Sequence, residues 1–398
     1  MSTASRTLLM PLLVGINLLG ALALDAFLPA FSPIAQSLDA SPEEMQQTLS
    51  AFFLAFGVAN LFVGPLADRW GRRPIVLGGI LLNLLAFIAC ALVQTPGQLI
   101  AARLIQGVAG SAAVSITLAM IRDVHEAQEA QKAINRLVGF LMLGPILAPL
   151  VGSWLAASVG WRGLFMVLAA LSLFLLAYAL HKLPETLVSC ERKPPGMWNA
   201  MHGYRVALSN RRFVLLCVSF SAGFNGLFIY VLATPAFLGV HLGLVPTEYS
   251  MAFGFVILVS SLLFLTYQRL ARGAMPLRVV GWGFTAMAGA SIANLATNWA
   301  WSADISWALL PIVAYAGGFA LVAAPMQVFA LDVLPDQRGL TAALQATWVA
   351  MTNTAVAGLL VPLAMHSALA LAGASALLLF ISVTAWYFSA GTAQHRPV

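Results

Sequence analysis

Two ionisable side chains lie inside long apolar segments, where they could carry chemistry. Asp25 falls in the apolar run 8–32, and Arg103 falls in the run 97–121. At ~1.5 Å per residue, both lie roughly 8–12 Å below the outer end of their segments. A carboxyl that alternates between a desolvated site and the neighbourhood of a cation can bind and release a proton. We therefore predict that Asp25 carries a proton and that Arg103, which stays protonated, modulates it.

Each residue also has a simpler interpretation that needs no function. Asp25 would then be an acid at a helix end in the headgroup region, because Pro29 and Pro33 follow it closely. Arg103 would snorkel toward the outer interface. The sequence alone is compatible with both interpretations of each residue.

Composition decides which elements must position this pair. The chain has 398 residues, of which 61% are hydrophobic and 9% are charged, and its mean hydropathy is +0.90. Soluble domains hold only ~45–50% apolar residues, so we predict an integral membrane protein. Apolar runs occur at 8–32, 45–67, 74–94, 97–121, 137–157, 160–182, 213–240, 248–268, 279–299, 305–331, 339–364 and 367–390. Because lipid satisfies no backbone polar group, these runs must be helices. The predicted fold is all-α, with twelve transmembrane helices in two six-helix bundles.

The charged residues set the predicted domains and orientation. All of the 20 Lys and Arg residues except Arg103 and Arg162 fall on one side of this topology. The positive-inside rule places that side, with both termini, in the cytoplasm. We predict an N-terminal bundle over 1–182, a cytoplasmic linker over 183–211 and a C-terminal bundle over 212–398. The net charge of +6 is thus a topology signal, and no nucleic-acid partner is expected.

The string GPLADRWGRRP at 64–74 concentrates charge in the predicted turn between the second and third helices. Asp68 and Arg72 are four residues apart, which suits a local ion pair. Gly71 permits a turn conformation that a side chain would obstruct. Gly64 and Pro65 are expected to let the preceding helix end against a close neighbour. The simpler interpretation is a positively charged topology anchor, which explains neither the acid nor the glycines.

Several strings resemble signatures of the major facilitator superfamily. GPLADRWGRRP resembles its loop 2–3 signature, LIAARLIQGVAG at 99–110 its helix 4 motif, and GPILAPLVGS at 144–153 its helix 5 antiporter motif. LDAFLPA at 24–30, QTLS at 47–50 and FIYVLATPAF at 228–237 resemble the Bcr/CflA-type drug-resistance branch, as do Trp161-Arg162 and Pro184-Glu185-Thr186. Ser153 departs from the pattern, since a second glycine is often found there. So does Asn17, which stands where some multidrug members carry a second acid.

The resemblance implies roles for particular residues. A conformational-switch loop would comprise Gly64, Asp68, Arg69, Gly71, Arg72 and Arg73. The antiporter motif would comprise Gly144, Pro145, Pro149 and Gly152. Asp25 and Arg103 would communicate across a central cavity, because helices 1 and 4 both line it in this superfamily. Candidates for the substrate cavity are Asn17, Phe53, Phe56, Gln106, Phe224, Asn225, Phe228 and Tyr230, although aromatic residues also pack against lipid or neighbouring helices.

These features together predict a function. We expect a proton-coupled secondary transporter that exports drugs or other amphiphilic small molecules by alternating access. It would act as a monomer in the bacterial inner membrane, with the proton gradient as its energy source and no cofactor or metal. A cavity with one titratable carboxyl and an arginine should favour neutral, zwitterionic or anionic ligands over dications. The alternative within transport is a specific metabolite or siderophore carrier, which could be an importer.

An enzyme is not expected. A membrane-embedded enzyme would need a catalytic constellation such as H-E-x-x-H or paired aspartates, and no such pattern occurs around the six histidines. A channel fits the composition, but the organisation in two halves favours alternating access.

Overall fold

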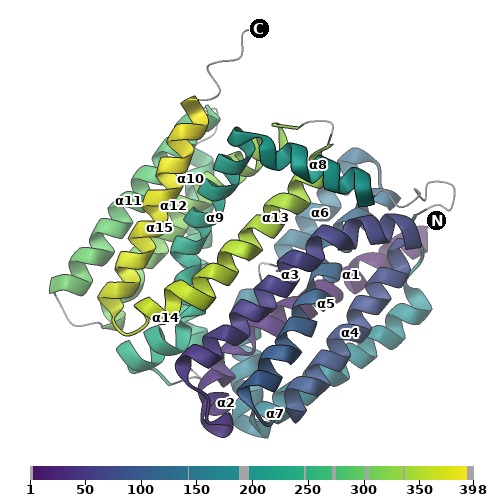
Figure 1. Cartoon of the computed structure of the whole chain (residues 1–398), viewed down its shortest axis with the longest axis horizontal. Helices are drawn as coiled ribbons and strands as arrows, with labels where there is room; N and C mark the ends of the chain where they lie inside the picture. The colour runs from purple at the N-terminus through teal and green to yellow at the C-terminus, as the bar shows by residue number, and fades with distance from the viewer. Residues whose placement is uncertain are drawn as a thin grey trace. The chain divides into compact units, whose positions relative to one another are not determined.

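The structure is a computed structural model that describes residues 3–141, 143–187, 197–245, 248–270, 275–300, 304–334 and 337–391. It is 91% helix, and the described residues contain no strand. The chain divides into two compact units, Met1–Ala200 and Met201–Val398. Both are bundles of long helices (Figure 1). The all-helical part of the predicted fold is therefore confirmed.

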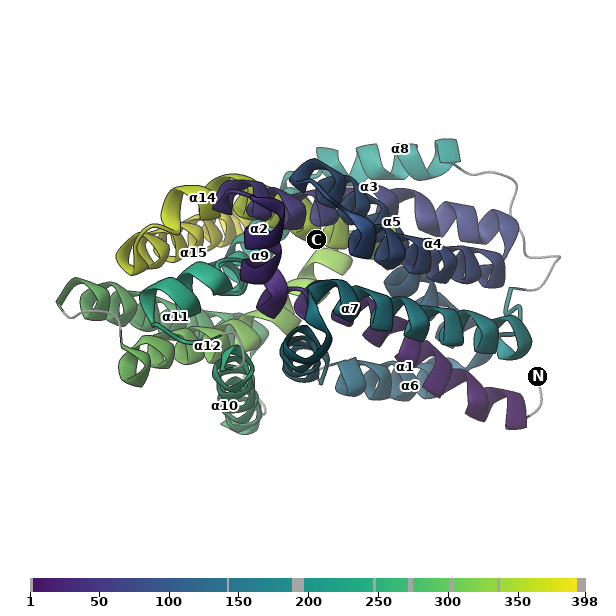
Figure 2. The same cartoon turned by 90° about the horizontal axis from the view of Figure 1, so that it is seen from below.

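The first unit is built around one central helix, α5. Its elements are α1 (Thr3–Asp25), the 3-10 turn η1 (Leu28–Ala30), α2 (Phe31–Leu38), α3 (Pro42–Trp70), α4 (Arg72–Leu92), α5 (Pro96–Val124), α6 (Ala127–Leu141) and α7 (Gly144–Lys182). Helix α5 packs along α3 and α4 and also contacts α1 and α6, and α3, α5 and α4 run side by side in Figure 1. Helix α7 packs on α1 and α4, and Figure 2 shows it beside α1. Helix α5 thus holds α1, α3, α4 and α6 together in one bundle.

The second unit is organised around α9. Its elements are α8 (Met197–Ser209), which begins just before the boundary between the units, α9 (Arg211–Leu232), the π-helical segment η3 (Pro235–His241), α10 (Tyr249–Leu270), α11 (Pro276–Ala300), α12 (Ile305–Leu331), α13 (Arg338–Ala355), the π-helical segment η5 (Val356–Leu360), α14 (Val361–Ala364) and α15 (Ala368–Gly391). Helix α9 contacts α15, α12 and α13, while α11 packs along α12 and α15.

Ten helical segments among the described residues are long and apolar enough to cross a membrane. Two predicted crossings, 137–157 and 160–182, correspond to a single one of them, Leu147–Lys182 in α7. A straight helix of that length would measure roughly 54 Å, well beyond the ~30 Å hydrocarbon core. Gly160, with φ 75°, divides α7 into two halves in a conformation that favours glycine. The predicted crossing 248–268 corresponds to α10, which is not among the ten, so the count of twelve stays a prediction.

The boundaries 1–182, 183–211 and 212–398 stay a prediction as well. Residues 188–196 of the predicted linker lie outside the described part of the chain.

The first predicted helix is not continuous, which corrects the expectation for 8–32. Helix α1 ends at Asp25, and the chain continues through η1 and α2 to Leu38 within one candidate membrane span, Leu9–Leu38. The residues that follow the break, Leu28 and Pro29 in η1 and Phe31 in α2, are buried. Asp25 therefore lies at a helix end inside the span rather than in an unbroken helix.

Candidate functional site

Arg103 lies on α5 and is the largest fully buried side chain among the described residues, with 0% of its surface exposed. Its Nη1 donates a hydrogen bond of 2.7 Å to the main-chain carbonyl of Ala23 on α1. The same nitrogen donates to the Gln106 Oε1 atom one turn along α5. The arginine therefore ties α5 to the last turn of α1.

The break in α1 explains why an arginine is suited to this place. The last carbonyls of a helix have no donor within that helix, and they form the negative end of its dipole. Because α1 ends at Asp25, the Ala23 carbonyl is one of these groups. A guanidinium satisfies its hydrogen-bonding capacity and also places a positive charge at the negative helix end.

Two phenyl rings complete the surroundings of Arg103. The guanidinium carbon lies 4.5 Å from the centre of the Phe27 ring and 4.8 Å from the centre of the Phe52 ring, within the range of cation–π attraction. Its Nε and Nη2 atoms, and the Nε2 atom of Gln106, have no hydrogen-bond partner among the described residues. The site thus keeps unused donors in a buried, aromatic environment, where a carboxylate or another acceptor would be bound strongly.

Asp25 lies between two contacts that reach α1 from other helices. Arg103 binds the carbonyl of Ala23, two residues before it, and Gly152 on α7 lies against the backbone of Ala26, one residue after it. The Asp25 side chain is partly exposed, and it forms no ion pair or hydrogen bond in the part of the chain that the structure describes. Asp25 and Arg103 are therefore close in the chain fold but not paired with each other.

The antiporter-motif residues lie at the start of α7. They are Gly144, Pro145, Pro149 and Gly152. A methyl group at Gly144 would lie 3.1 Å from the Ala21 Cβ atom, and one at Gly152 would lie 2.6 Å from the Ala26 α-carbon. Glycine is thus required at Gly152, where α7 passes the backbone of Ala26, whereas the contact at Gly144 is tight but not prohibitive. The prolines differ, since Pro145 occupies the first turn and is exposed, whereas Pro149 lies inside the helix and is buried.

The predicted switch loop is a single residue, Gly71. Asp68 belongs to the last turn of α3 and Arg72 opens α4, and their side chains form an ion pair of 2.7 Å. The Arg72 Nε atom also lies 3.2 Å from the Asp123 carboxylate at the end of α5. Gly71 adopts φ 99°, which a residue with a side chain rarely adopts. The charged residues therefore join the end of α3, the start of α4 and the end of α5 around a turn of one residue.

Glu185, which follows α7, caps the start of α4. Its carboxylate accepts hydrogen bonds from the main-chain amides of Arg72 (2.9 Å) and Arg73 (3.3 Å). An acid at a helix N-terminus satisfies orphan amides and complements the dipole. The neighbouring Thr186 donates to the Asp123 carboxylate over 2.9 Å. The sequence analysis assigned no role to Glu185, Thr186 or Asp123. Its one signal for the first two was the resemblance of the Pro184-Glu185-Thr186 string to the drug-resistance branch.

The remaining loop residues differ from this group. The Arg73 Nη2 atom donates to the Leu180 carbonyl on α7 over 2.7 Å. Arg69 lies over the ring of Trp70, 5.7 Å from its centre. Gly64 lies within α3 and not at its end, and a methyl group there would meet nothing within 4 Å. The expectation that Gly64 and Pro65 end the helix against a close neighbour is therefore wrong.

The cavity candidates of the first unit differ in burial and in their contacts, and their role in a cavity stays a prediction. Asn17 is buried and donates to the Leu13 carbonyl (2.8 Å) and to the Thr117 hydroxyl (2.9 Å), which joins α1 to α5. On α3, Phe53 is buried, whereas Phe56 is partly exposed. Gln106 belongs to the Arg103 site already described.

The candidates of the second unit lie on α9. Phe224 and Phe228 are partly exposed and stack with ring centres 4.9 Å apart. Asn225 is fully buried, and its Nδ2 atom donates to the Asn353 side chain over 2.8 Å. The Asn225 Oδ1 atom has no partner among the described residues.

The last candidate, Tyr230, is also buried on α9. Its hydroxyl accepts a hydrogen bond of 2.6 Å from Asn294 on α11. Neither asparagine partner, Asn353 or Asn294, was singled out from the sequence.

Residues 13–357 match the profile described as Major Facilitator Superfamily, which is most of the chain. The chain belongs to this superfamily. The superfamily is one of multi-pass membrane transporters. The family resemblance of its loop, helix 4 and helix 5 strings is thereby confirmed.

Relatives of this superfamily member carry names that refer to drug resistance. The bicyclomycin resistance protein homolog of Haemophilus influenzae is 28% identical over 243 residues, covering 61% of each chain. The multidrug resistance protein MdtL of Klebsiella pneumoniae is 27% identical over 237 residues, covering 60% of each chain. The matches thus span about three fifths of these relatives. They agree with the resemblance to the drug-resistance branch.

A solved structure shares the fold over nearly the full length. The bacterial homolog of the human lysosomal transporter Spinster superposes with a TM-score of 0.74, covering 98% of this chain and 97% of that chain, at 15% identity.

Proposed function

We propose that this superfamily member is a proton-coupled antiporter that exports amphiphilic small molecules by alternating access. It would act as a monomer in the bacterial inner membrane, with both termini in the cytoplasm and no cofactor beyond the proton gradient. The names of the relatives support export of drugs, and the distribution of Lys and Arg supports the orientation.

The observation that carries the proposal is the position of Asp25 between two helix contacts. The other acids of the candidate spans, Glu43, Glu44, Asp68 and Asp123, lie within two residues of a span end. Asp25 instead stands at the break in α1, where Arg103 and Gly152 hold the backbone on either side. Broken helices with free terminal groups are where transporters bind ions and substrates.

A coupling cycle follows from these residues. When Asp25 is protonated it needs no counter-charge, and when it has lost the proton it can accept hydrogen bonds from the free Nε and Nη2 atoms of Arg103. Such a switch would change the contacts of α1 with α5, so that proton binding and release favour different arrangements of the transporter. Each unit also offers partly exposed phenyl rings, Phe56 in the first and Phe224 and Phe228 in the second, and rings of this kind suit contact with amphiphilic ligands.

The experiment is a proton-release assay in everted membrane vesicles with an imposed pH gradient. Adding a substrate of an antiporter dissipates the gradient, so the wild type should respond to bicyclomycin or to members of an amphiphile panel. The Asp25→Asn variant should give no response at equal protein level, whereas Asp39→Asn, an exposed acid with φ 50° that asparagine tolerates, should behave as wild type.

Two other results would change the proposal. A fully active Asp25→Asn protein would remove Asp25 from coupling. Substrate movement driven in the inward direction would instead favour the specific metabolite or siderophore carrier.

A further inference from the structure

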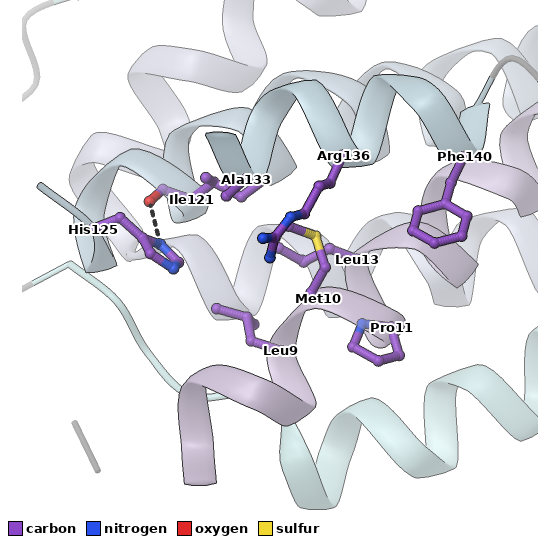
Figure 3. A pocket seen from close by; sticks show the side chains of 9 residues that line it. All are labelled: Leu9, Met10, Pro11, Leu13, Ile121, His125, Ala133, Arg136 and Phe140. Carbon is purple, nitrogen blue, oxygen red and sulfur yellow. Dashed lines mark hydrogen bonds between the residues drawn. The ribbon is translucent and has the colours of Figure 1, made fainter. Parts of the chain in front are cut away.

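A cavity of about 450 Å³ opens in the first unit between α1, α5 and α6, apart from the Arg103 site (Figure 3). Its lining residues are Leu9, Met10, Pro11, Leu13, Ile121, His125, Ala133, Arg136 and Phe140. A cavity of this size accommodates part of a large organic ligand. None of these residues takes part in the proposed proton or substrate path.

The lining combines an apolar floor with two nitrogen-containing groups. Leu9 and Leu13 of α1 and Ile121 of α5 are buried and form the floor. The His125 Nδ1 atom donates a hydrogen bond of 3.0 Å to the Ile121 carbonyl, which fixes the ring at the edge of the cavity. Arg136 is exposed and reaches from α6 toward Met10, as Figure 3 shows.

No acid in the described part of the chain pairs with the positive charge of Arg136. Of the three ion pairs among the described residues, none includes Arg136, and its side chain forms no hydrogen bond there. Such an arginine can bind an anionic group, and the apolar cavity beside it can bind a hydrocarbon chain attached to that group.

The surroundings indicate where such a chain would lie. From the rim of the cavity, exposed apolar residues continue from Phe140 (51% exposed) at the end of α6 to Leu143 (46%) and Leu147 (46%) at the start of α7. The cavity itself lies at the first turns of the α1 span and the end of α5. In the orientation of the proposed function, on which this step rests, these ends reach the headgroup level of the cytoplasmic leaflet. Basic pockets between helices on that side bind anionic headgroups.

We propose that this cavity binds the phosphate headgroup of an anionic phospholipid from the cytoplasmic leaflet. Arg136 contacts the phosphate, and an acyl chain follows Phe140, Leu143 and Leu147. A soluble anion would gain nothing from the apolar floor and from this exposed strip, which is why the structure favours a lipid.

The test uses the full-length protein in detergent and native mass spectrometry, with dioleoyl-phosphatidylglycerol and dioleoyl-phosphatidylcholine as probes. The wild type should bind the anionic lipid in preference to the zwitterionic one. Arg136→Gln should lower that preference by about fivefold, the effect of one basic residue near a membrane surface. Lys132→Gln is the matched control, because Lys132 is an exposed cation one turn earlier on α6 that does not line the cavity.

Three results would overturn the proposal: an unchanged preference in Arg136→Gln, an equal loss in Lys132→Gln, or displacement of the lipid by inorganic phosphate. The assay needs neither a gradient nor a transported substrate. A failure of lipid binding therefore leaves the antiport proposal intact, and loss of antiport activity does not bear on the lipid site.

Discussion

The guanidinium of Arg103 donates a 2.7 Å hydrogen bond to the main-chain carbonyl of Ala23, two residues before the end of α1. This bond replaces a donor that a continuous helix would have supplied from its own next turn. The break at Asp25 and the buried arginine therefore depend on each other. The arginine gives the free carbonyl of Ala23 a donor, and the carbonyl gives the buried guanidinium an acceptor.

We predict that Arg103→Lys lowers gradient-driven transport about tenfold or more. A lysine ammonium can replace the two bonds of Nη1 but lacks the Nε and Nη2 donors that the proposed cycle offers to Asp25, and a buried charged hydrogen bond lost without replacement has an effect of this size. The matched control is Arg162→Lys, because Arg162 also donates to a carbonyl, that of Val93. Initial rates in everted vesicles at equal expression test this, and equal rates for the two variants would contradict it.

We predict that Asp68→Asn lowers the transport rate about five- to tenfold while equilibrium ligand binding changes little. The variant loses the 2.7 Å pair with Arg72, which lies at a junction of three helix ends, so it should shift the conformational equilibrium rather than the ligand contacts. Asp332→Asn is the control, because Asp332 and Arg338 form an exposed pair of similar length, 2.8 Å. An unchanged rate for Asp68→Asn would reduce this turn to a topology anchor.

We predict that Gly152→Ala destabilises the protein by about 1–3 kcal/mol, the usual cost of overpacking. The added methyl group would overlap the backbone of Ala26, which cannot move without shifting Asp25. Gly78→Ala, in the interior of α4 with nothing within 4 Å, should be neutral or stabilising. Thermal unfolding of the purified variants tests both. A melting temperature for Gly152→Ala at or above that of Gly78→Ala would show that α7 does not press on α1.

We predict that neutral, zwitterionic and anionic amphiphiles stabilise the purified protein better than permanent dications. Arg103 contributes a buried positive charge with free donors, and Asp25 is the one carboxyl well inside a described candidate span, so a second positive charge on the ligand would stay uncompensated. A thermal-shift series on one ring system carrying net charges of −1, 0, +1 and +2 tests this. If the dication gave the strongest stabilisation, a further acid would have to lie beside the bound ligand.

The sequence predicted what depends on local spacing and on apolar composition. The apolar runs appear as long helices, and the pair expected from the four-residue spacing of Asp68 and Arg72 is present. The helix break at Asp25 was not predicted, because it is stabilised by an arginine 80 positions away that binds a backbone carbonyl. A carbonyl has no side-chain signature in a sequence.

The same reason applies to the other contacts that were missed. Glu185 binds the amides of Arg72 and Arg73 more than 110 positions earlier in the chain, and Gly152 is required only because α7 passes the backbone of Ala26. Main-chain acceptors, main-chain donors and close backbone approaches are properties of the folded chain. Residue type identified Arg103, Glu185 and Gly152 as unusual but could not give their partners.

Gly71 also has a mechanical consequence. It alone separates the 29 residues of α3 from the 21 residues of α4, and the residue after it, Arg72, is bonded to α5 and to the segment after α7. The ion pair between Asp68 and Arg72 spans this one-residue turn, so the turn has little freedom to bend. We therefore expect a displacement at the end of α3 to be transmitted to the start of α4.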